Sequence, residues 1–527
     1  MNIAELLREQ AHGHPDAPAI IDTWHGHPRR TTYAELERAA GQGAALLWRA
    51  GLRPGHPVLV CVPMSAELYA ALIAMFRLGV VPMFVDPAMG RTHLEQCCAI
   101  APPRAFIGSA KAHLLRAVSP ALRRIPRKFV VGMPVPGAVA WSQAERLAPR
   151  EEVRTCQRDE PALITFTSGS TGQPKAAVRT HGLLLAQYRV LARHFGGSEP
   201  AGGLGMTALP IFVLADLAAG DTSLIPPGDL RHPGRIDPQP VIAALDAFSP
   251  SRAGGSPAFW ERIVAHCREQ QRTLPHLRTI YLGGAPVFPH LLDALHEIAP
   301  QARIVAVYGS TEAEPIAHIA YGEMQTDDLA AMASGHGLLV GTPVPEIQLR
   351  VLQNHWGTPI GPLSAAAFAS WCLPPGEPGE IVVSGEHVLP GYLHGQGDEE
   401  TKFRVAGVMW HRTGDAGYRD AAGRLWLLGR SAARIADDRG TLYPFTVECA
   451  VSAVPEVRRA ALVASEGRRT LAFERRAHVS PAALAALRRS VAWADIDEFR
   501  ELRHIPVDRR HNAKVDYPAL RRMLARA

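Results

Sequence analysis

The first 150 residues alternate between helical and strand-like patterns of hydrophobic side chains. Residues 31–51 show the spacing of an amphipathic helix that ends at Gly51, and residues 65–79 predict a second helix. Residues 56–62 and 80–86 are short apolar runs that predict buried strands. Strands that alternate with helices indicate βαβ units and a parallel sheet.

This alternation continues through residues 161–196 and 278–310, and after about residue 335 the pattern changes. Short segments alternate by twos with glycine between them, which predicts a small antiparallel β subdomain at about residues 336–428. Residues 363–379 are expected to form an insertion loop. Residues 429–527 then predict a small α+β domain. The predicted division is therefore an N-terminal domain of residues 1–428 and a C-terminal domain of residues 429–527.

Composition excludes several classes of protein. Of the 527 residues, 47% are hydrophobic and 20% charged, and the net charge is +6 with arginines scattered along the chain. No nucleic-acid partner is expected from such a distribution. The seven cysteines are an odd number without a Cys-x-x-Cys pair, so we expect neither a zinc site nor a disulfide framework.

The sequence predicts a cytoplasmic protein without a membrane span. The start, MNIAELLREQ, lacks the pattern of a signal peptide. The most apolar stretch, residues 71–87, carries Arg77, Gly79 and Pro82, which favours a helix and a buried strand over a transmembrane segment.

Lysine is rare in this chain. It occurs five times beside 51 arginines, at Lys111, Lys128, Lys175, Lys402 and Lys514. A lysine retained under this bias is a candidate for a site that needs a compact ammonium group, with chance as the alternative.

One lysine ends the segment TFTSGSTGQPKAAVRTHG (residues 165–182). The glycines let backbone N–H groups approach an anion, the hydroxyls donate further hydrogen bonds, and the lysine adds charge. This composition predicts a polyphosphate cradle between a strand and a helix, whereas a flexible Ser/Gly hairpin is the alternative. It is not a Walker loop, because Pro174 precedes the lysine. The candidate residues are Thr167, Ser168, Gly169, Ser170, Thr171, Gly172 and Lys175.

The segment resembles the signature loop of the adenylate-forming superfamily, which includes acyl-CoA synthetases and peptide-synthetase adenylation domains. Further motifs of that family follow in order: LGGAPV (282–287), VYGSTEAEP (307–315), HRTGDAGY (411–418), Gly429-Arg430 and RRHNAKVD (509–516). The resemblance implies an adenine site at Gly284, Ala285, Pro286, Tyr308, Gly309 and Ser310. It further implies an α-phosphate contact at Thr311, a Mg²⁺ ligand at Glu312, ribose contacts at Asp415 and Arg430, and a catalytic lysine at Lys514.

The resemblance also implies a fold and a reaction. The expected fold is α/β, with a large N-terminal domain of two packed mixed sheets, helices and a small β subdomain, and a mobile α+β C-terminal lid that carries Lys514. The expected reaction is ATP-dependent adenylation of a small-molecule carboxylic acid, in which Lys175, Thr311, Glu312 and Lys514 stabilise charge. A nucleophilic serine, Ser168 or Ser170 with His181 as base, is the disfavoured alternative.

Departures from the common family pattern point to a smaller group. Ala432 stands at the hinge position, residues 436–444 replace the usual pantetheine-tunnel segment, and Val213 replaces a frequent histidine. Residues 80–108, 440–463 and 505–515 resemble the bacterial olefin β-lactone synthetases. That resemblance implies a β-hydroxy fatty acid that is adenylated and then cyclised by its own hydroxyl, with AMP released.

Several alternatives stay open at this point. An acyl-CoA synthetase or acyl-carrier-protein ligase would instead form a thioester, and a non-catalytic nucleotide-binding protein is the third interpretation. The resemblance suggests a biosynthetic multi-enzyme assembly as a partner. An acyl pocket is expected at Ile211, Phe212, Val213 and Leu214, with a buried strand as the alternative for that segment. The polar residues Asp216, His181, Glu314 and His318 are either pocket or structural residues.

Overall fold

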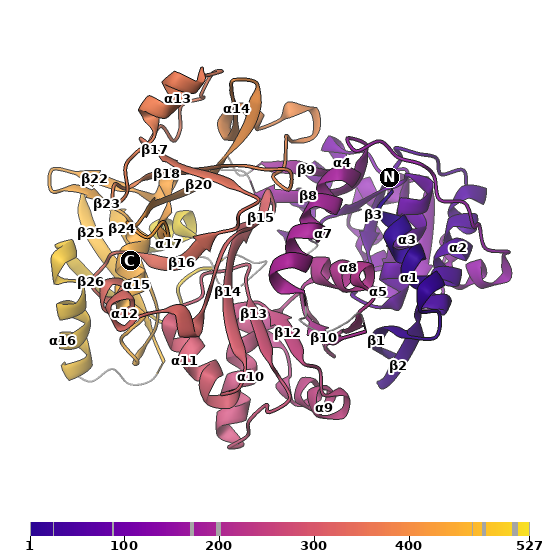
Figure 1. Cartoon of the computed structure of the whole chain (residues 1–527), viewed down its shortest axis with the longest axis horizontal. Coiled ribbons are helices and arrows are strands. Elements are labelled where there is room, and N and C mark those ends of the chain that lie inside the picture. Colours follow the sequence, from indigo (N-terminus) through magenta and orange to yellow (C-terminus); the bar gives the residue numbers. More distant parts are fainter. Residues whose placement is uncertain are drawn as a thin grey trace. The chain divides into compact units, whose positions relative to one another are not determined.

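The computed structural model describes residues 2–24, 26–86, 89–168, 173–196, 202–465, 467–476, 481–507 and 515–525. The chain divides into two compact units (Figure 1). Unit 1 contains Met1–Gly255, His276–Arg278 and Glu386–Gly397, and unit 2 contains Ser256–Pro275, Thr279–Gly385 and Asp398–Ala527.

Unit 1 is built on two sheets. The first has seven strands in the order β7 (Val139–Ala140), β6 (Arg127–Val131), β5 (Ala105–Ser109), β3 (Pro57–Cys61), β4 (Val81–Phe84), β8 (Pro161–Ser168) and β9 (Pro174–Thr180). Its strand pairs are parallel except β8 with β9, which form an antiparallel hairpin. The second sheet of this unit contains β12 (Arg252–Gly255), β10 (Leu204–Thr207), β11 (Thr222–Leu224), β1 (Pro18–Trp24) and β2 (His27–Thr32). The predicted parallel strands are thus confirmed.

Helices pack against these sheets. They are α1 (Ile3–Gly13), α2 (Tyr33–Arg49), α3 (Ala66–Leu78), α4 (Arg91–Ile100), α5 (Ala110–His113), α6 (Pro120–Arg124), α7 (His181–Phe195), α8 (Pro210–Ala219) and α9 (Pro238–Phe248). The predicted helix at 31–51 is α2, and Thr32 starts it through a capping box with Glu35.

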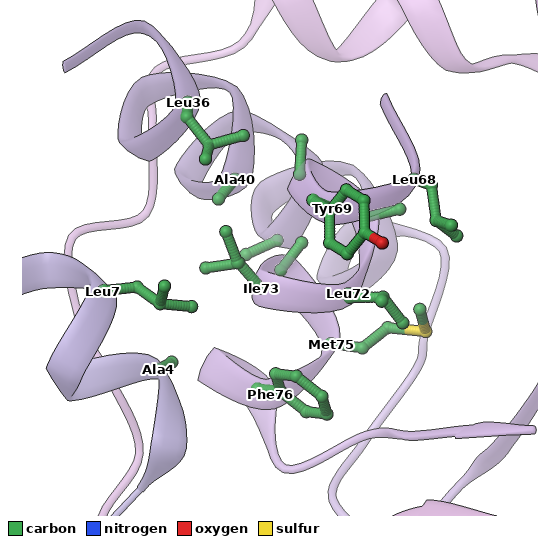
Figure 2. Close-up of a cluster of buried hydrophobic side chains, with 14 of the residues drawn as sticks. Ala4, Leu7, Leu36, Ala40, Leu68, Tyr69, Leu72, Ile73, Met75 and Phe76 are labelled. Carbon is green, nitrogen blue, oxygen red and sulfur yellow. The ribbon is translucent and has the colours of Figure 1, made fainter. Parts of the chain in front are cut away.

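The central helix of the core is α3. All of its residues except Glu67 are buried, which explains why its sequence is apolar on every side. Figure 2 shows its side chains between Ala4 and Leu7 of α1 and Leu36 and Ala40 of α2. The single buried cation of this helix, Arg77, pairs with Glu37 on α2.

Unit 2 contains a mostly antiparallel sheet. Its order is β17 (Gln348–Leu352), β18 (Gly379–Ser384), β20 (Val408–Arg419), β21 (Leu425–Arg430), β16 (Leu338–Pro343), β15 (Ala313–Ala320), β14 (Arg303–Ser310) and β13 (Thr279–Leu282), with β19 (Lys402–Val405) beside β20. Only β13 and β14 pair in parallel among these strands. The antiparallel character predicted after residue 335 is therefore confirmed.

The helices of this part are α10 (Pro257–Glu269), α11 (Pro289–Ile298), α12 (Thr326–Ala333), α13 (Ala365–Trp371) and α14 (Asp398–Thr401). Helix α13 lies within residues 363–379, so the expected insertion loop is partly helical. Its N-cap is Ser364, whose hydroxyl accepts from the N–H of Ala367.

Residues 429–527 form a small α+β arrangement within unit 2. It contains β22 (Ile435–Asp437), β23 (Gly440–Leu442), α15 (Pro444–Val451), β24 (Val457–Ser465), β25 (Arg468–Arg475), α16 (Pro481–Ser490), β26 (Glu498–Leu502) and α17 (Tyr517–Leu524). Val447, Leu462, Leu471 and Leu487 belong to a hydrophobic cluster of this segment alone. The fold class predicted from the sequence is confirmed, and the domain boundary at residue 429 and the mobility of the lid stay predictions.

All seven cysteines are free thiols. Among the described residues, no helix combines the length and the apolar character that crossing a bilayer requires.

Candidate active site

Three predicted nucleotide residues meet in unit 2. The Tyr308 hydroxyl donates a hydrogen bond of 2.8 Å to Asp415 Oδ2. Arg430 Nη1 lies 3.3 Å from Asp415 Oδ1. Asp415 and Arg430 are direct partners across the β20–β21 ladder, so the strand register fixes their approach. The structure therefore brings together the residues that the sequence assigned to adenine and ribose.

The surroundings of Tyr308 keep its hydroxyl protonated. Burial and the neighbouring Asp415 carboxylate raise the pKa of Tyr308 well above its usual value, so the phenol stays a donor. A carboxylate offers about four acceptor positions, so Asp415 retains acceptor capacity beyond Tyr308 and Arg430. The Arg430 side chain is 51% exposed and accessible to a ligand. This arrangement is suited to accept from the two hydroxyls of a ribose.

The segment Gly309–Glu312 forms the turn from β14 to β15. The ladder has an irregularity between Tyr308 and Ser310, and a Cβ atom on Gly309 would lie 3.0 Å from the Ala313 carbonyl oxygen. Ser310 Oγ accepts from the Glu312 N–H at 3.3 Å. The close approach explains the glycine, and the turn presents Thr311 and Glu312 directly after Tyr308.

The Gly-Ala-Pro turn follows the neighbouring strand. β13 ends at Leu282, which pairs with Ala306 of β14, so residues 284–286 and Tyr308 leave two adjacent parallel strands at the same edge. Gly284 has a φ of +82°, a conformation that favours glycine. Nucleotides bind at such carboxyl ends of parallel strands in many α/β proteins.

Lys402 is a residue of this region to which sequence reasoning assigned no role. It begins β19, is only 5% exposed, and interacts electrostatically with Glu312 and Asp398. Burial lowers its pKa to about 8, against the opposing influence of the two carboxylates. The scarcity of lysine was the signal in the sequence that could have drawn attention to Lys402. The sequence alone could not place Lys402 near Glu312, because 90 positions separate the two residues.

The predicted phosphate cradle lies in unit 1, on the β8–β9 hairpin. Thr167 at the end of β8 is the ladder partner of Lys175 on β9. Gly169, Ser170, Thr171, Gly172 and the side chain of Ser168 lie outside the described residues. The phosphate cradle and the flexible Ser/Gly hairpin therefore both stay open as interpretations of this motif.

The position of Lys175 is tightly constrained. It is 8% exposed, and its Nζ lies 5.7 Å from the centroid of the Tyr392 ring. A Cβ atom on Gly397 would lie 2.5 Å from Lys175 Cε, and the φ of Gly397, +96°, favours glycine at this position. The stem of Lys175 is thus held in place by its neighbours within unit 1.

His181 has a structural contact. It is 1% exposed, and its Nδ1 accepts a hydrogen bond of 3.3 Å from the Ile3 N–H. Burial lowers its pKa to about 4. The imidazole therefore connects the start of α7 to α1, which favours the structural interpretation over a catalytic base.

The expected acyl-pocket segment is helix α8, so the alternative of a buried strand is wrong. Pro210 at its first turn starts the helix and Gly220 ends it with a φ of +82°. Val213 is fully buried, and Ile211, Phe212 and Leu214 are partly buried.

Asp216 on the same helix belongs to a polar network in unit 1. Ser223 donates to its Oδ2 at 2.7 Å, and Arg252 Nη2 lies 3.7 Å from Asp216 and 2.5 Å from Asp221. Burial raises the pKa of Asp216 to about 7. Two carboxylates thus share one guanidinium, which supports a structural interpretation for Asp216.

Lys514 lies outside the described residues, so its predicted role stays a prediction. The same holds for the contacts predicted for Thr311 and Glu312 with phosphate and metal. Glu314 and His318 lie on β15, and nothing separates their pocket and structural interpretations.

The donor set is suitable for Mg²⁺ only together with a nucleotide. Glu312 offers the carboxylate oxygen that this cation prefers. Among the described residues, no cluster of three His, Cys, Asp or Glu side chains could hold a metal ion. A Mg²⁺ site at Glu312 stays a prediction.

Comparison with known proteins identifies the class. The family described as AMP-binding enzyme matches residues 7–393. The chain therefore belongs to the AMP-binding enzymes and is an ATP-using, adenylate-forming ligase.

Two relatives are similar along almost the entire chain. The olefin beta-lactone synthetase of Stenotrophomonas maltophilia (strain K279a) is 33% identical, over 98% of this chain and 96% of the relative. The protein of the same description from Xanthomonas campestris pv. campestris (strain ATCC 33913) is 32% identical with the same coverage. The predicted resemblance to this group is confirmed.

A solved structure shares the fold. The anthranilate CoA ligase AuaEII, in complex with anthranoyl-AMP, matches with a TM-score of 0.82 and 17% identity, over 100% of this chain and 98% of that chain.

Proposed function

We propose that the chain adenylates a β-hydroxy fatty acid and converts the acyl-AMP into a β-lactone. The observation that carries this proposal is the similarity to two olefin beta-lactone synthetases over 98% of the chain. The unusual hinge supports it, because a lactone-forming enzyme has no need of a pantetheine tunnel.

In the first step, a carboxylate oxygen of the substrate attacks the α-phosphorus of ATP and pyrophosphate leaves. Asp415 accepts from the ribose, while Tyr308 holds Asp415 and lies beside the adenine. Lys175 and Lys514 supply positive charge to the phosphates, and Mg²⁺, which Glu312 would hold, would supply further positive charge. Both reactants are anions, so this preorganised charge lowers the barrier.

In the second step, the β-hydroxyl oxygen of the substrate attacks its own acyl carbon. The bond between that carbon and the AMP oxygen breaks, AMP leaves with the bonding electrons, and the hydroxyl proton passes to solvent. No protein nucleophile is needed, because the attacking group is already part of the bound intermediate. The apolar residues of α8 suit a fatty chain.

The alternative is thioester formation with CoA or an acyl carrier protein. It is favoured by the many AMP-binding enzymes that use the same first step, and by the fold shared with a CoA ligase. For either function, we also propose a cytoplasmic location and membership of a multi-enzyme assembly.

A panel of acids tests the two functions. Pyrophosphate release is measured with Mg·ATP and matched 3-hydroxy and plain fatty acids, with and without CoA, and products are identified by mass. The β-lactone proposal requires turnover with 3-hydroxy acids in the absence of CoA. Turnover that requires CoA and accepts plain acids would establish the thioester ligase instead.

Lys514→Ala tests the adenylation step separately. The variant should lose acyl-AMP formation while it binds ATP almost normally, because the lysine acts on the transition state. Equal loss of binding and chemistry would show that Lys514 has a structural role.

A further inference from the structure

A cluster of exposed apolar side chains lies in residues 104–139 of unit 1, which we call the 104–139 surface. Leu114, Val118, Met133 and Val139 are 73%, 52%, 74% and 39% exposed. The described part of the chain has nine exposed large hydrophobic residues, and four of them lie within the 26 positions from Leu114 to Val139. Single exposed apolar residues are ordinary, but such a concentration marks an interaction site.

The four residues come from adjoining elements. Lys111, Leu114 and Val118 follow one another at spacings of three and four along α5 and the 3₁₀ turn Leu114–Ala117, so they share one face. Arg116 in this turn donates to the Pro136 carbonyl at 3.0 Å. That bond connects the turn to the exposed β6–β7 connection that carries Met133, and Val139 begins β7.

The charge of this surface has a single sign. Residues 96–144 contain no Asp or Glu, whereas the average of 50 acids in 527 residues would place about five in such a stretch. The same stretch holds seven cations: Arg104, Lys111, Arg116, Arg123, Arg124, Arg127 and Lys128.

These cations have no acidic partner within the described residues. None of the seven forms an ion pair there, whereas arginines elsewhere in the chain form many. The pKa values of Lys128 and His113 are lowered, chiefly by burial. Neighbouring positive charge adds to this effect: Arg116 contributes to the lowering for Lys128, and Arg116 and Lys128 both contribute for His113. The surface is therefore complementary to a dense layer of negative charge.

We propose that the 104–139 surface binds the anionic surface of a lipid membrane. Exposed aliphatic side chains in the same stretch as cations that have no acidic partner among the described residues match the two forces of peripheral membrane binding, which are apolar insertion and attraction to acidic headgroups. An interface for a protein would more often present Trp or Tyr at its centre, and this cluster presents Leu, Val and Met. If the substrate is a fatty acid, as proposed above, the membrane is where that substrate accumulates, but the surface itself does not depend on that assignment.

Vesicle sedimentation of the full chain tests the proposal. Wild-type protein should sediment with phosphatidylcholine vesicles that contain 30% phosphatidylglycerol, and much less with phosphatidylcholine alone or at high salt. The double variants Leu114→Ser with Met133→Ser, and Arg123→Glu with Arg124→Glu, should each weaken binding to the anionic vesicles at least tenfold.

Matched controls alter other exposed residues of the same chemical kinds, although Val408 and Met523, at 53% and 41%, are less exposed than Leu114 and Met133. Val408→Ser with Met523→Ser removes two exposed apolar residues, and Arg488→Glu with Arg489→Glu reverses two exposed arginines at the end of α16. Both control proteins should bind as the wild type does. Pyrophosphate release with a short water-soluble acid, unchanged in every variant, shows that the proteins are folded.

Three results would overturn the proposal. The first is wild-type protein that does not sediment with anionic vesicles. The second is a loss of binding in the control variants equal to that in the surface variants. The third is a lower oligomer mass in the surface variants alone, measured by light scattering without lipid. That result would mean that the surface joins copies of this chain.

Discussion

Lys402→Met should change metal and nucleotide binding in opposite directions. The substitution removes a buried ammonium that interacts with Glu312 and Asp398, and it keeps an unbranched apolar side chain in its place. The local charge becomes more negative by one unit, while the packing of β19 against β20 is preserved.

The size of the effect follows from the local charges. With a pKa of about 8, Lys402 carries its charge in about nine-tenths of the molecules at pH 7. A neighbouring opposite charge lowers the proton affinity of a carboxylate by about one to three pK units, and we take the lower end of that range as the guide for a bound cation. We therefore expect Mn²⁺, used as a probe in the absence of nucleotide, to bind about tenfold more tightly to the variant. Mg·ATP is an anion, so its KM should rise by about tenfold.

Equilibrium titration with Mn²⁺ and pyrophosphate release at varied Mg·ATP measure the two quantities. Lys402→Arg keeps the charge and should resemble the wild type in both assays. Lys111→Met removes an exposed lysine in unit 1 and serves as the control. Unchanged Mn²⁺ affinity, or a weakening of both ligands together, would refute the reasoning, because a folding defect would weaken both.

Three further substitutions test other parts of the structure. Asp216→Asn should stabilise the protein at pH 8 but not at pH 4. The pKa of Asp216, raised to about 7, means that charging this carboxyl costs stability as the pH rises from about 4 to 7, and urea unfolding should show a gain of roughly 4 kcal/mol at pH 8. Asp221→Asn, which removes the closer partner of Arg252, should instead destabilise the protein, and equal behaviour of the two variants would contradict the assignment. Glu380→Gln should lower the free energy of unfolding by about 3–5 kcal/mol, because Glu380 and Arg412 are 0% and 1% exposed and form a bidentate pair at 2.6 and 2.9 Å. A shift of the urea midpoint equivalent to less than about 1 kcal/mol would contradict this prediction. Tyr308→Phe keeps the ring but loses the donor to Asp415, so the KM for ATP should rise about tenfold with little change in kcat, and an unaltered KM would remove Tyr308 from the ribose site.

The motifs of the nucleotide site were predictable because each is a continuous run of residues. Tyr308 and Asp415 were assigned from two separate segments, and the structure adds the hydrogen bond that joins them. That contact depends on the β20–β21 register and on the end of β14, which no local pattern specifies. The pairing of Lys402 with Glu312 was not predictable for the same reason.

The prediction of secondary structure from the sequence failed where the local composition was ambiguous. Residues 209–220 are apolar except for Asp216, so their periodicity could not separate a helix from a buried strand, although Pro210 and Gly220 are the signals of a helix start and end. Residues 363–379 contain glycine and prolines that suggested a loop, but Ser364 caps a two-turn helix of alanines and aromatics. Both errors came from weighing composition above capping residues.

The second chemical step is the central claim, and a preformed intermediate tests it most directly. The acyl-AMP of a 3-hydroxy fatty acid is added to the enzyme without CoA, and AMP release and product mass are followed. The account predicts AMP release with a product lighter than the free acid by one water, and no such product from the acyl-AMP that lacks the hydroxyl. Release of AMP only after CoA is added, with a thioester as the product, would contradict it.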